Sequence, residues 1–238
     1  MKYMGSKSRI KAHLLKFISE AIRTSGTNVF IDPFCGGCNV VDEVQCAHRI
    51  ASDISLPLIE LFKALVRGQE FPVSVSKDLY DDVRKNRYTG KYPQWMVGAV
   101  GYLASYNGKM FGGLADTIKT KGGVRYYYDE AKRNIEAQIR RLIDVKFECC
   151  DYVQYSDYQG AVIYCDIPYA GVTQYAESKK FDYDRFWNWC RHVSKNNIVL
   201  VSERNAPSDF MPRWSLEVTR TLIGRTVGVK AERLFQLM

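Results

Sequence analysis

What the sequence lacks excludes several classes of protein. No uninterrupted apolar run approaches the ~20 residues that cross a bilayer, and the first residues, MKYMGSKSRIK, have no apolar core of the kind found in signal peptides. Neither a G-x-G-x-x-G fingerprint nor a phosphate-binding-loop lysine is present, and there is no internal repeat or low-complexity tract. We therefore expect a cytoplasmic protein whose ligand has no pyrophosphate group.

Cysteines are too few and too scattered for a disulfide framework. The chain has seven, an odd number at core-like positions, which is typical of reduced thiols. Cys35 and Cys38 form one C-x-x-C pair, but no second pair with metal-ligand spacing follows, and Cys46 and His48 fall on an expected helix and its exit. We therefore predict no metal site, and zinc binding or thioredoxin-like chemistry is the weaker alternative.

Acidic residues are outnumbered by basic ones. The 238 residues include 34 Lys and Arg against 26 Asp and Glu, which gives a formal charge of +8 and a pI near 9.0. This excess favours a polyanionic partner such as nucleic acid, although many basic proteins bind none. With 46% hydrophobic and 25% charged residues, the composition is typical of a soluble globular protein with one large domain or a domain with an insertion.

A predicted strand at 162–165 organises the chain. Its continuous apolar character indicates a buried strand, and open parallel sheets bind ligands outside the carboxyl ends of their strands. Asp166 follows at that end and can accept one hydrogen bond from a nucleobase amine, while the Ile167 carbonyl, directed by Pro168, can accept the other. Tyr169 offers a ring on which a base can stack. The alternative is a proline turn that carries an acid and a tyrosine by chance.

The first predicted strand, 29–31, leads into a glycine turn. Asp32 and Phe34 precede Gly36 and Gly37, and we expect a helix to follow. A strand, a glycine turn and a helix in this order let a ligand approach backbone N–H groups.

A second short strand, 49–52, ends at Asp53, sixteen residues after Gly37. In nucleoside-binding α/β folds an acid at this offset accepts hydrogen bonds from ribose hydroxyls. The alternative is that Asp53 caps a helix that starts near Leu56. Both interpretations place Asp53 at the same edge of the sheet as Asp32.

The alternation of strands and helices breaks down between residues 68 and 143. Residues 77–146 hold fourteen basic and eight acidic residues, interleaved with many tyrosines. This composition is typical of an insertion that reads nucleic acid, and a helical subdomain with a solvated basic face is the alternative. We expect helices at 77–85, 93–105 and 129–142, and a basic, glycine-rich loop at 108–125.

The remaining pattern predicts an α/β protein. Strands are expected at 146–150 and 198–201, and amphipathic helices at 10–22 and 181–195. The closing stretches, 216–222 and 233–237, are predicted to be antiparallel strands joined by a basic loop.

Seven short motifs follow one another in a specific order. Together they resemble the Dam-type DNA adenine-N6 methyltransferases, particularly forms found in phages and prophages. Each motif alone is weak, but their joint order is specific and extends over nearly the whole chain. The motifs are KYMGSK (2–7), FIDPFCGGCNV (30–40), ASDIS (51–55), SYNGKMFGG (105–113), ECCDY (148–152), YCDIPY (164–169) and VSERNAP (201–207).

The resemblance implies a Rossmann-like methyltransferase fold with a mostly parallel sheet and an antiparallel last strand. Residues 1–67 and 144–238 would form the catalytic domain, and 68–143 a mainly helical target-recognition insertion. The protein would be a site-specific, adenine-specific DNA methyltransferase that uses S-adenosylmethionine and flips its target base out of double-stranded DNA. It would act in a bacterium or a phage-infected host, in a phage or restriction–modification context, as a monomer, with weak dimerisation left open.

Residue roles follow from the matched positions. Asp53 would hold the ribose hydroxyls of the cofactor, and Asp151 would approach its adenine. The other cofactor-binding positions would be Tyr3, Lys7, Asp32, Phe34, Gly36, Gly37 and Asp166. Asp166, Ile167, Pro168 and Tyr169 would hold the target adenine, and Asn107, Lys109, Lys119, Lys121 and Arg125 would bind DNA.

Ile167 departs from the family pattern, which has proline at this position. Because the adenine amine is expected to meet the backbone carbonyl, isoleucine need not abolish catalysis. Two alternatives remain open: a catalytically impaired DNA-binding relative, or an amino-methyltransferase that acts on cytosine-N4, RNA or a glutamine side chain.

Overall fold

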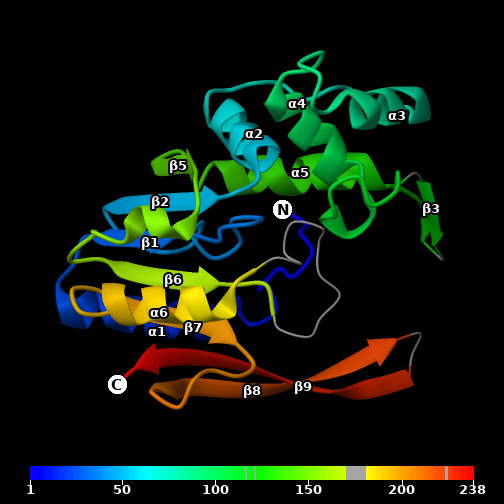
Figure 1. Cartoon of the computed structure of the whole chain (residues 1–238). Helices are drawn as coiled ribbons and strands as arrows, with labels where there is room; N and C mark the ends of the chain where they lie inside the picture. The colour runs from blue at the N-terminus through cyan, green and yellow to red at the C-terminus, as the bar shows by residue number, and fades with distance from the viewer. Residues whose placement is uncertain (116, 121, 170–180, 223–224) are drawn as a thin grey trace.

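A seven-stranded, mostly parallel sheet forms the centre of the protein (Figure 1). The computed structural model describes residues 1–115, 117–120, 122–169, 181–222 and 225–238, and only the backbone of 118–120 and of the described residues within 218–230. Five neighbouring strands of this sheet are mutually parallel, and the strand that follows them, β9 (Arg225–Leu237), is antiparallel to its neighbour β7 (Ile198–Glu203). This confirms the predicted fold class. The strand order is β5 (Val145–Cys149), β2 (His48–Asp53), β1 (Val29–Asp32), β6 (Val162–Asp166), β7 (Ile198–Glu203), β9 (Arg225–Leu237) and β8 (Phe210–Leu222).

Alternate residues of the central strands pack on opposite faces of the sheet. In β6, Val162 and Tyr164 join one apolar cluster, whereas Ile163 and Cys165 join another. Helices α1 (Lys11–Ser25) and α2 (Leu56–Val66) contribute to the first cluster, and α6 (Tyr183–Val193) contributes to the second. Because both faces are covered, the apolar run of β6 is continuous rather than alternating.

The inserted segment is mainly helical, as predicted. It contains α3 (Lys77–Asn86), α4 (Gln94–Gly98), which runs into a π-helical turn η1 (Ala99–Leu103), and α5 (Tyr127–Ile139). Most of its buried apolar side chains belong to the same cluster as those of α1 and α2. The insertion therefore shares a core with the sheet, and its description as a separate target-recognition region remains a proposal.

Three local predictions differ from the structure. No helix follows the glycine turn, because residues 39–43 form turns and His48 is the first residue of β2. The basic loop expected at 108–125 contains a short hairpin, β3 (Thr117–Thr120) and β4 (Gly123–Tyr126). The described residues of the basic stretch expected to link the last two strands, 221–222 and 225–233, belong to β8 and β9, which are each 13 residues long.

Gly98 sets the approach of α4 to α2. A Cβ at Gly98 would lie 2.1 Å from the Pro57 carbonyl oxygen and 3.0 Å from the Leu61 Cβ. Because the nearest atom belongs to the backbone, relief would require one helix to move. Gly98 therefore allows the insertion to pack directly on α2.

We expect Gly98→Ala to lower the free energy of unfolding by about 1–3 kcal/mol through overpacking. Urea denaturation measures the change. Ser19→Ala on the exposed face of α1 is the control and should stay within about 0.5 kcal/mol of wild type. An unchanged stability in Gly98→Ala would show that the two helices are free to separate.

Candidate active site

Three acidic residues lie at the carboxyl ends of neighbouring parallel strands. Asp32 ends β1, Asp53 ends β2 and Asp166 ends β6, and the arrowheads of β2 and β6 point to the same side of the sheet (Figure 1). One cavity of about 1800 Å³ opens at this edge. All the predicted cofactor and target-base positions line it: Tyr3, Lys7, Asp32, Phe34, Gly36, Gly37, Asp53, Asp151, Asp166, Ile167, Pro168 and Tyr169.

Lys7 supplies the positive charge at the centre of the site. Its ammonium lies 2.9 Å from Asp166 Oδ1 and 3.7 Å from Glu232 Oε2, and its side chain is only 9% exposed. It also lies 4.0 Å from the centre of the Tyr169 ring. The Tyr169 hydroxyl donates to Glu232 Oε2 at 2.6 Å, so the four side chains form one connected group.

Burial sets the protonation of the two central carboxyls. It raises the pKa of Asp32 well above its usual range, and the neighbouring Asp166 carboxylate adds to the shift. Burial also raises the pKa of Asp166, although the Lys7 ammonium opposes this change. Lys7 therefore favours an ionised Asp166, which can accept hydrogen bonds.

The glycine turn packs against the protein's own Tyr3. A Cβ at Gly36 or at Gly37 would lie 2.7 Å from an atom of the Tyr3 side chain, and Gly36 also has a positive φ of 45°. The Gly36 N–H donates to Asp53 Oδ2 at 3.2 Å. Glycine is thus required here for packing within the protein, and this N–H already has a partner.

Asp53 links the ends of two strands. One carboxylate oxygen accepts from Gly36, and the other accepts from the Ser55 N–H at 2.9 Å, directly before α2. The side chain thus holds the turn before α2 but does not cap the helix, because the N-cap residue is Ser55, and it also lines the cavity.

Aromatic side chains form one wall of the cavity. The rings of Phe34 and Tyr152 are stacked at 5.5 Å, and Phe181 meets Phe34 at 5.9 Å. Asp151 accepts from the Val153 N–H at 3.1 Å and thereby caps the short 3₁₀ helix that carries Tyr152. A flat apolar wall with an acid at its edge suits a planar heterocycle that bears amino groups.

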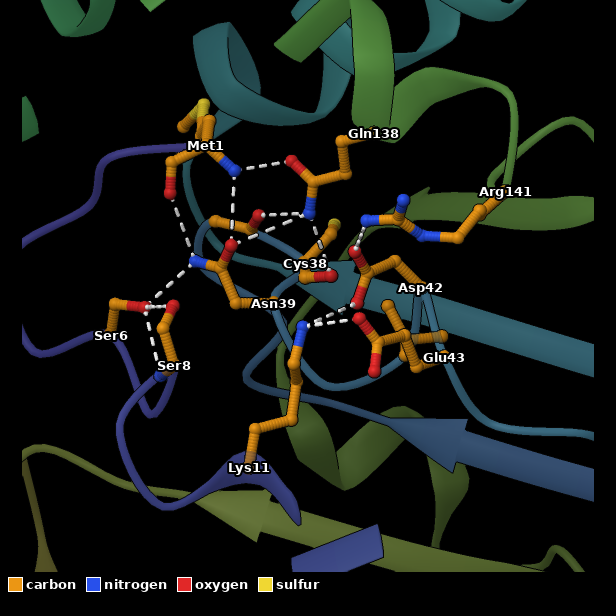
Figure 2. Close-up of polar contacts among 12 residues, drawn as sticks. Met1, Ser6, Ser8, Lys11, Cys38, Asn39, Asp42, Glu43, Gln138 and Arg141 are labelled. Carbon is orange, nitrogen blue, oxygen red and sulfur yellow. Dashed lines mark hydrogen bonds and ion pairs between the residues drawn. The ribbon is translucent and has the colours of Figure 1, made fainter. Parts of the chain in front are cut away.

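Helix α5 is joined to the glycine turn by polar contacts (Figure 2). Gln138 Nε2 donates to the carbonyl oxygens of Gly37 and Cys38, each at 3.0 Å. Asn39 Nδ2 donates to the Met1 carbonyl oxygen at 3.1 Å. The insertion and the amino-terminal segment therefore both hold the turn in place.

The predicted DNA-binding residues are only partly brought together. Asn107 has a positive φ of 56° and lines the cavity. Arg125 forms an ion pair with Glu130 beside β4. Lys109 does not line the cavity, the side chain of Lys119 is not described, and Lys121 lies outside the described residues.

Two charged residues of the site were not assigned a role from the sequence. Arg204 follows β7, and its guanidinium lies 5.4 Å from the centre of the Tyr169 ring. It falls in a motif, VSERNAP, that the resemblance covers. Glu232 lies on β9, and no local signal in the basic stretch around it indicated a role.

The described part of the chain shows no other kind of reactive centre. All seven cysteines, including Cys35 and Cys38, are free thiols, and no three His, Cys, Asp or Glu side chains group so that they could hold a metal ion. Among the described helices, none is long and apolar enough to cross a membrane.

A family model matches the amino-terminal part of the chain. Residues 3–93 match the family model for D12 class N6 adenine-specific DNA methyltransferases, which confirms the resemblance seen in the sequence and supports an adenine-specific DNA methyltransferase. Such an enzyme acts on DNA and requires a methyl donor. The search of curated proteins found no match.

One solved structure with an overall likeness is a Haemophilus influenzae protein provisionally described as a methylase. It shares 10% sequence identity with this chain, over 96% of this chain and 88% of that one, with a TM-score of 0.37. A likeness of this size establishes neither a shared fold nor a shared function.

The buried Asp32 carboxyl should destabilise the ligand-free protein at neutral pH. The pKa of Asp32 is higher in the folded protein than in the unfolded chain, so the unfolded chain ionises this carboxyl more readily and is favoured at neutral pH. This loss of stability disappears as the pH falls through the pKa of an aspartate in the unfolded chain, about 4. We therefore expect Asp32→Asn to be more stable than wild type at pH 7, and the difference to shrink towards pH 4.

Urea titrations at the two pH values measure this difference. Asp157→Asn, at an exposed position, is the control and should change stability by less than about 0.5 kcal/mol. An Asp32→Asn protein that is less stable than wild type at pH 7 would contradict the argument.

Proposed function

Because the chain matches the D12 class of N6 adenine-specific DNA methyltransferases over residues 3–93, we propose that it transfers a methyl group from S-adenosylmethionine to the N6 amine of an adenine flipped out of double-stranded DNA. One observation carries the proposal. The strand end formed by Asp166 to Tyr169 opens into the same cavity as Asp53 and the glycine turn. A base and a cofactor can therefore meet there.

The residues present fit S-adenosylmethionine. The Asp53 carboxylate suits ribose hydroxyls, and the wall of Phe34 and Tyr152, with Asp151 at its edge, suits an adenine ring. Tyr3 and the glycine turn close one side of the cavity, beside the carboxyl groups of Asp32 and Asp166. When bound, S-adenosylmethionine supplies an electrophilic methyl group.

Residues 166–169 would hold and activate the target amine. The Asp166 carboxylate accepts one N–H of the amine and the Ile167 carbonyl accepts the other, so both stabilise the positive charge that develops on the nitrogen. Tyr169 supports the base through its ring. The Tyr183 hydroxyl donates to the Pro168 carbonyl oxygen at 2.8 Å and fixes the path of the chain after Ile167.

The basic insertion would bind the DNA backbone. Its hairpin carries Lys119 on β3 and Arg125 on β4, two of the residues that the sequence assigned to DNA, and Asn107 reaches the cavity from the same insertion. Each contact with a phosphate releases condensed counterions, so affinity should depend strongly on salt.

Methylation of mixed-sequence DNA, followed by nucleoside analysis and mapping of the modified positions, tests the function. We expect N6-methyladenine at one short sequence. Detection of methylcytosine, or of methylation in RNA alone, would show that the substrate is not adenine in DNA. Binding of DNA without any methyl transfer would indicate an impaired relative.

Asp166→Ala and Asp53→Ala should separate chemistry from cofactor binding. Asp166→Ala removes an acceptor for the amine, so we expect turnover to fall by about 10²–10³-fold while cofactor affinity is largely retained. Asp53→Ala should lower the affinity for the cofactor by about tenfold or more, because it removes a charged hydrogen-bond acceptor.

Calorimetric titration of the cofactor and single-turnover methylation measure the two effects. Thermal melting of each variant reports whether the fold is intact, which matters because Asp53 also bonds Gly36 and Ser55. Full activity in both variants would rule out this assignment of the site.

Neutralising Lys119, Lys121 and Arg125 together should weaken DNA binding and reduce its salt dependence, by about 0.9 in the logarithmic slope for each phosphate that is no longer neutralised. Fluorescence anisotropy over a salt series measures the slope. Lys16, Arg23 and Lys195, exposed and outside the insertion, provide a control triple variant with the same charge change. An equal slope in both triple variants would show that the hairpin does not contact DNA.

A further inference from the structure

In the ligand-free protein, Lys7 occupies the groups that are proposed to hold the adenine. Its ammonium contacts Asp166 Oδ1 at 2.9 Å and lies over the Tyr169 ring at 4.0 Å. An ammonium resembles the target amine, since both donate hydrogen bonds to a carboxylate. The base can therefore reach Asp166 Oδ1 and this face of the ring only if the ammonium moves.

Moving this ammonium is unfavourable unless another anion receives it. The Lys7 side chain is 9% exposed, and a buried charge without a partner is strongly destabilising. Glu232 Oε2 lies 3.7 Å from the ammonium, in ion-pair range but beyond a direct hydrogen bond. A small movement of the flexible lysine would bring it onto this second carboxylate.

Glu232 is fixed in the position that this exchange requires. The Tyr169 hydroxyl donates to Oε2 at 2.6 Å, and this is the same oxygen that faces Lys7. Glu232 also lies on β9, where the adjacent residue, Arg233, is in register with Glu203 of β7. The backbone of Glu232 is thus fixed by the sheet, and its carboxylate is held by Tyr169.

We propose that Glu232 is a positioning residue of the target-base site, which receives the Lys7 ammonium when the adenine amine takes its place on Asp166 and Tyr169. This inference rests on the proposed function. Lys7 then has two states: it shields Asp166 before the base enters, and it pairs with Glu232 while the base is bound. Glu232 does not touch the reacting atoms and acts through Lys7.

Glu232→Gln tests the charge alone. The amide retains an oxygen that can accept from Tyr169, but it cannot neutralise the ammonium, so Lys7 should stay on Asp166 and compete with the base. We expect the Michaelis constant for DNA to rise about tenfold, with a smaller change in the single-turnover rate at saturating DNA. Glu217→Gln, at an exposed position on β8, is the matched control and should behave as wild type.

A double-mutant cycle with Lys7→Gln distinguishes positioning from a general structural role. Without the ammonium there is nothing to relocate, so Glu232→Gln should change base capture by less than about twofold in the Lys7→Gln background. Tyr169→Phe removes the hydroxyl that fixes Glu232 but leaves its charge, so with Lys at position 7 its effect on base capture should be smaller than that of Glu232→Gln, and with Gln at position 7 it should decrease further.

Fluorescence of 2-aminopurine at the mapped target adenine gives a readout that does not require turnover. Glu232→Gln should lower the unstacked fraction only when Lys7 is present. Equal decreases with and without Lys7 would overturn the inference while the proposed function stands. A wild-type protein that methylates no adenine would instead contradict the proposed function, and the inference would fall with it.

Discussion

Two carboxyls at the ends of adjacent parallel strands, with one ammonium beside them, constrain the rest of the site. Asp32 is almost fully buried, and both burial and Asp166 oppose its ionisation. The Lys7 ammonium favours the ionised form of Asp166. Lys7 belongs to the segment before α1 and not to the sheet. The site therefore depends on the amino-terminal residues being correctly placed over the strand ends, and Tyr3 on the glycine turn provides that placement.

Much of the fold could be predicted from the sequence, because its signals are local. Composition alone predicts β6, with its continuous apolar run, and β1, the strand before the glycine turn. Parallel strands then bring their carboxyl ends to one edge of the sheet. The failed prediction of a helix after Gly37 has a non-local cause. In this segment Asp42 forms an ion pair with Arg141 at 2.6 Å, and Asn39 forms a hydrogen bond with Met1. These partners are remote in sequence, so a local pattern of apolar residues cannot predict them. The role of Glu232 could not be predicted from the sequence for the same reason, since its partners Tyr169 and Lys7 are remote from it in the chain.

The insertion is connected to the sheet more closely than its sequence suggested. A basic, tyrosine-rich segment could have been attached to the sheet only by its two ends. Instead most of its buried apolar side chains join the apolar cluster of α1 and α2, and Gln138 holds the glycine turn directly. Helix α5 therefore contacts two regions directly, since its Glu130 pairs with Arg125 of the hairpin and its Gln138 bonds the glycine turn.

The packing of Tyr3 on Gly37 has a consequence for how the family can vary. Gly37 does not have a positive φ, so its backbone would accept other residues, and the Tyr3 Cβ and the Asn39 amide, each 2.7 Å from a Cβ at Gly37, are what exclude a side chain there. Even alanine at position 3 would keep this Cβ, so a smaller residue 3 alone would not make room. A relative with alanine or serine in its turn should therefore have a displaced amino-terminal segment and a different residue at position 39. Departures from the double glycine would then mark a changed amino-terminal wall rather than a missing cofactor site.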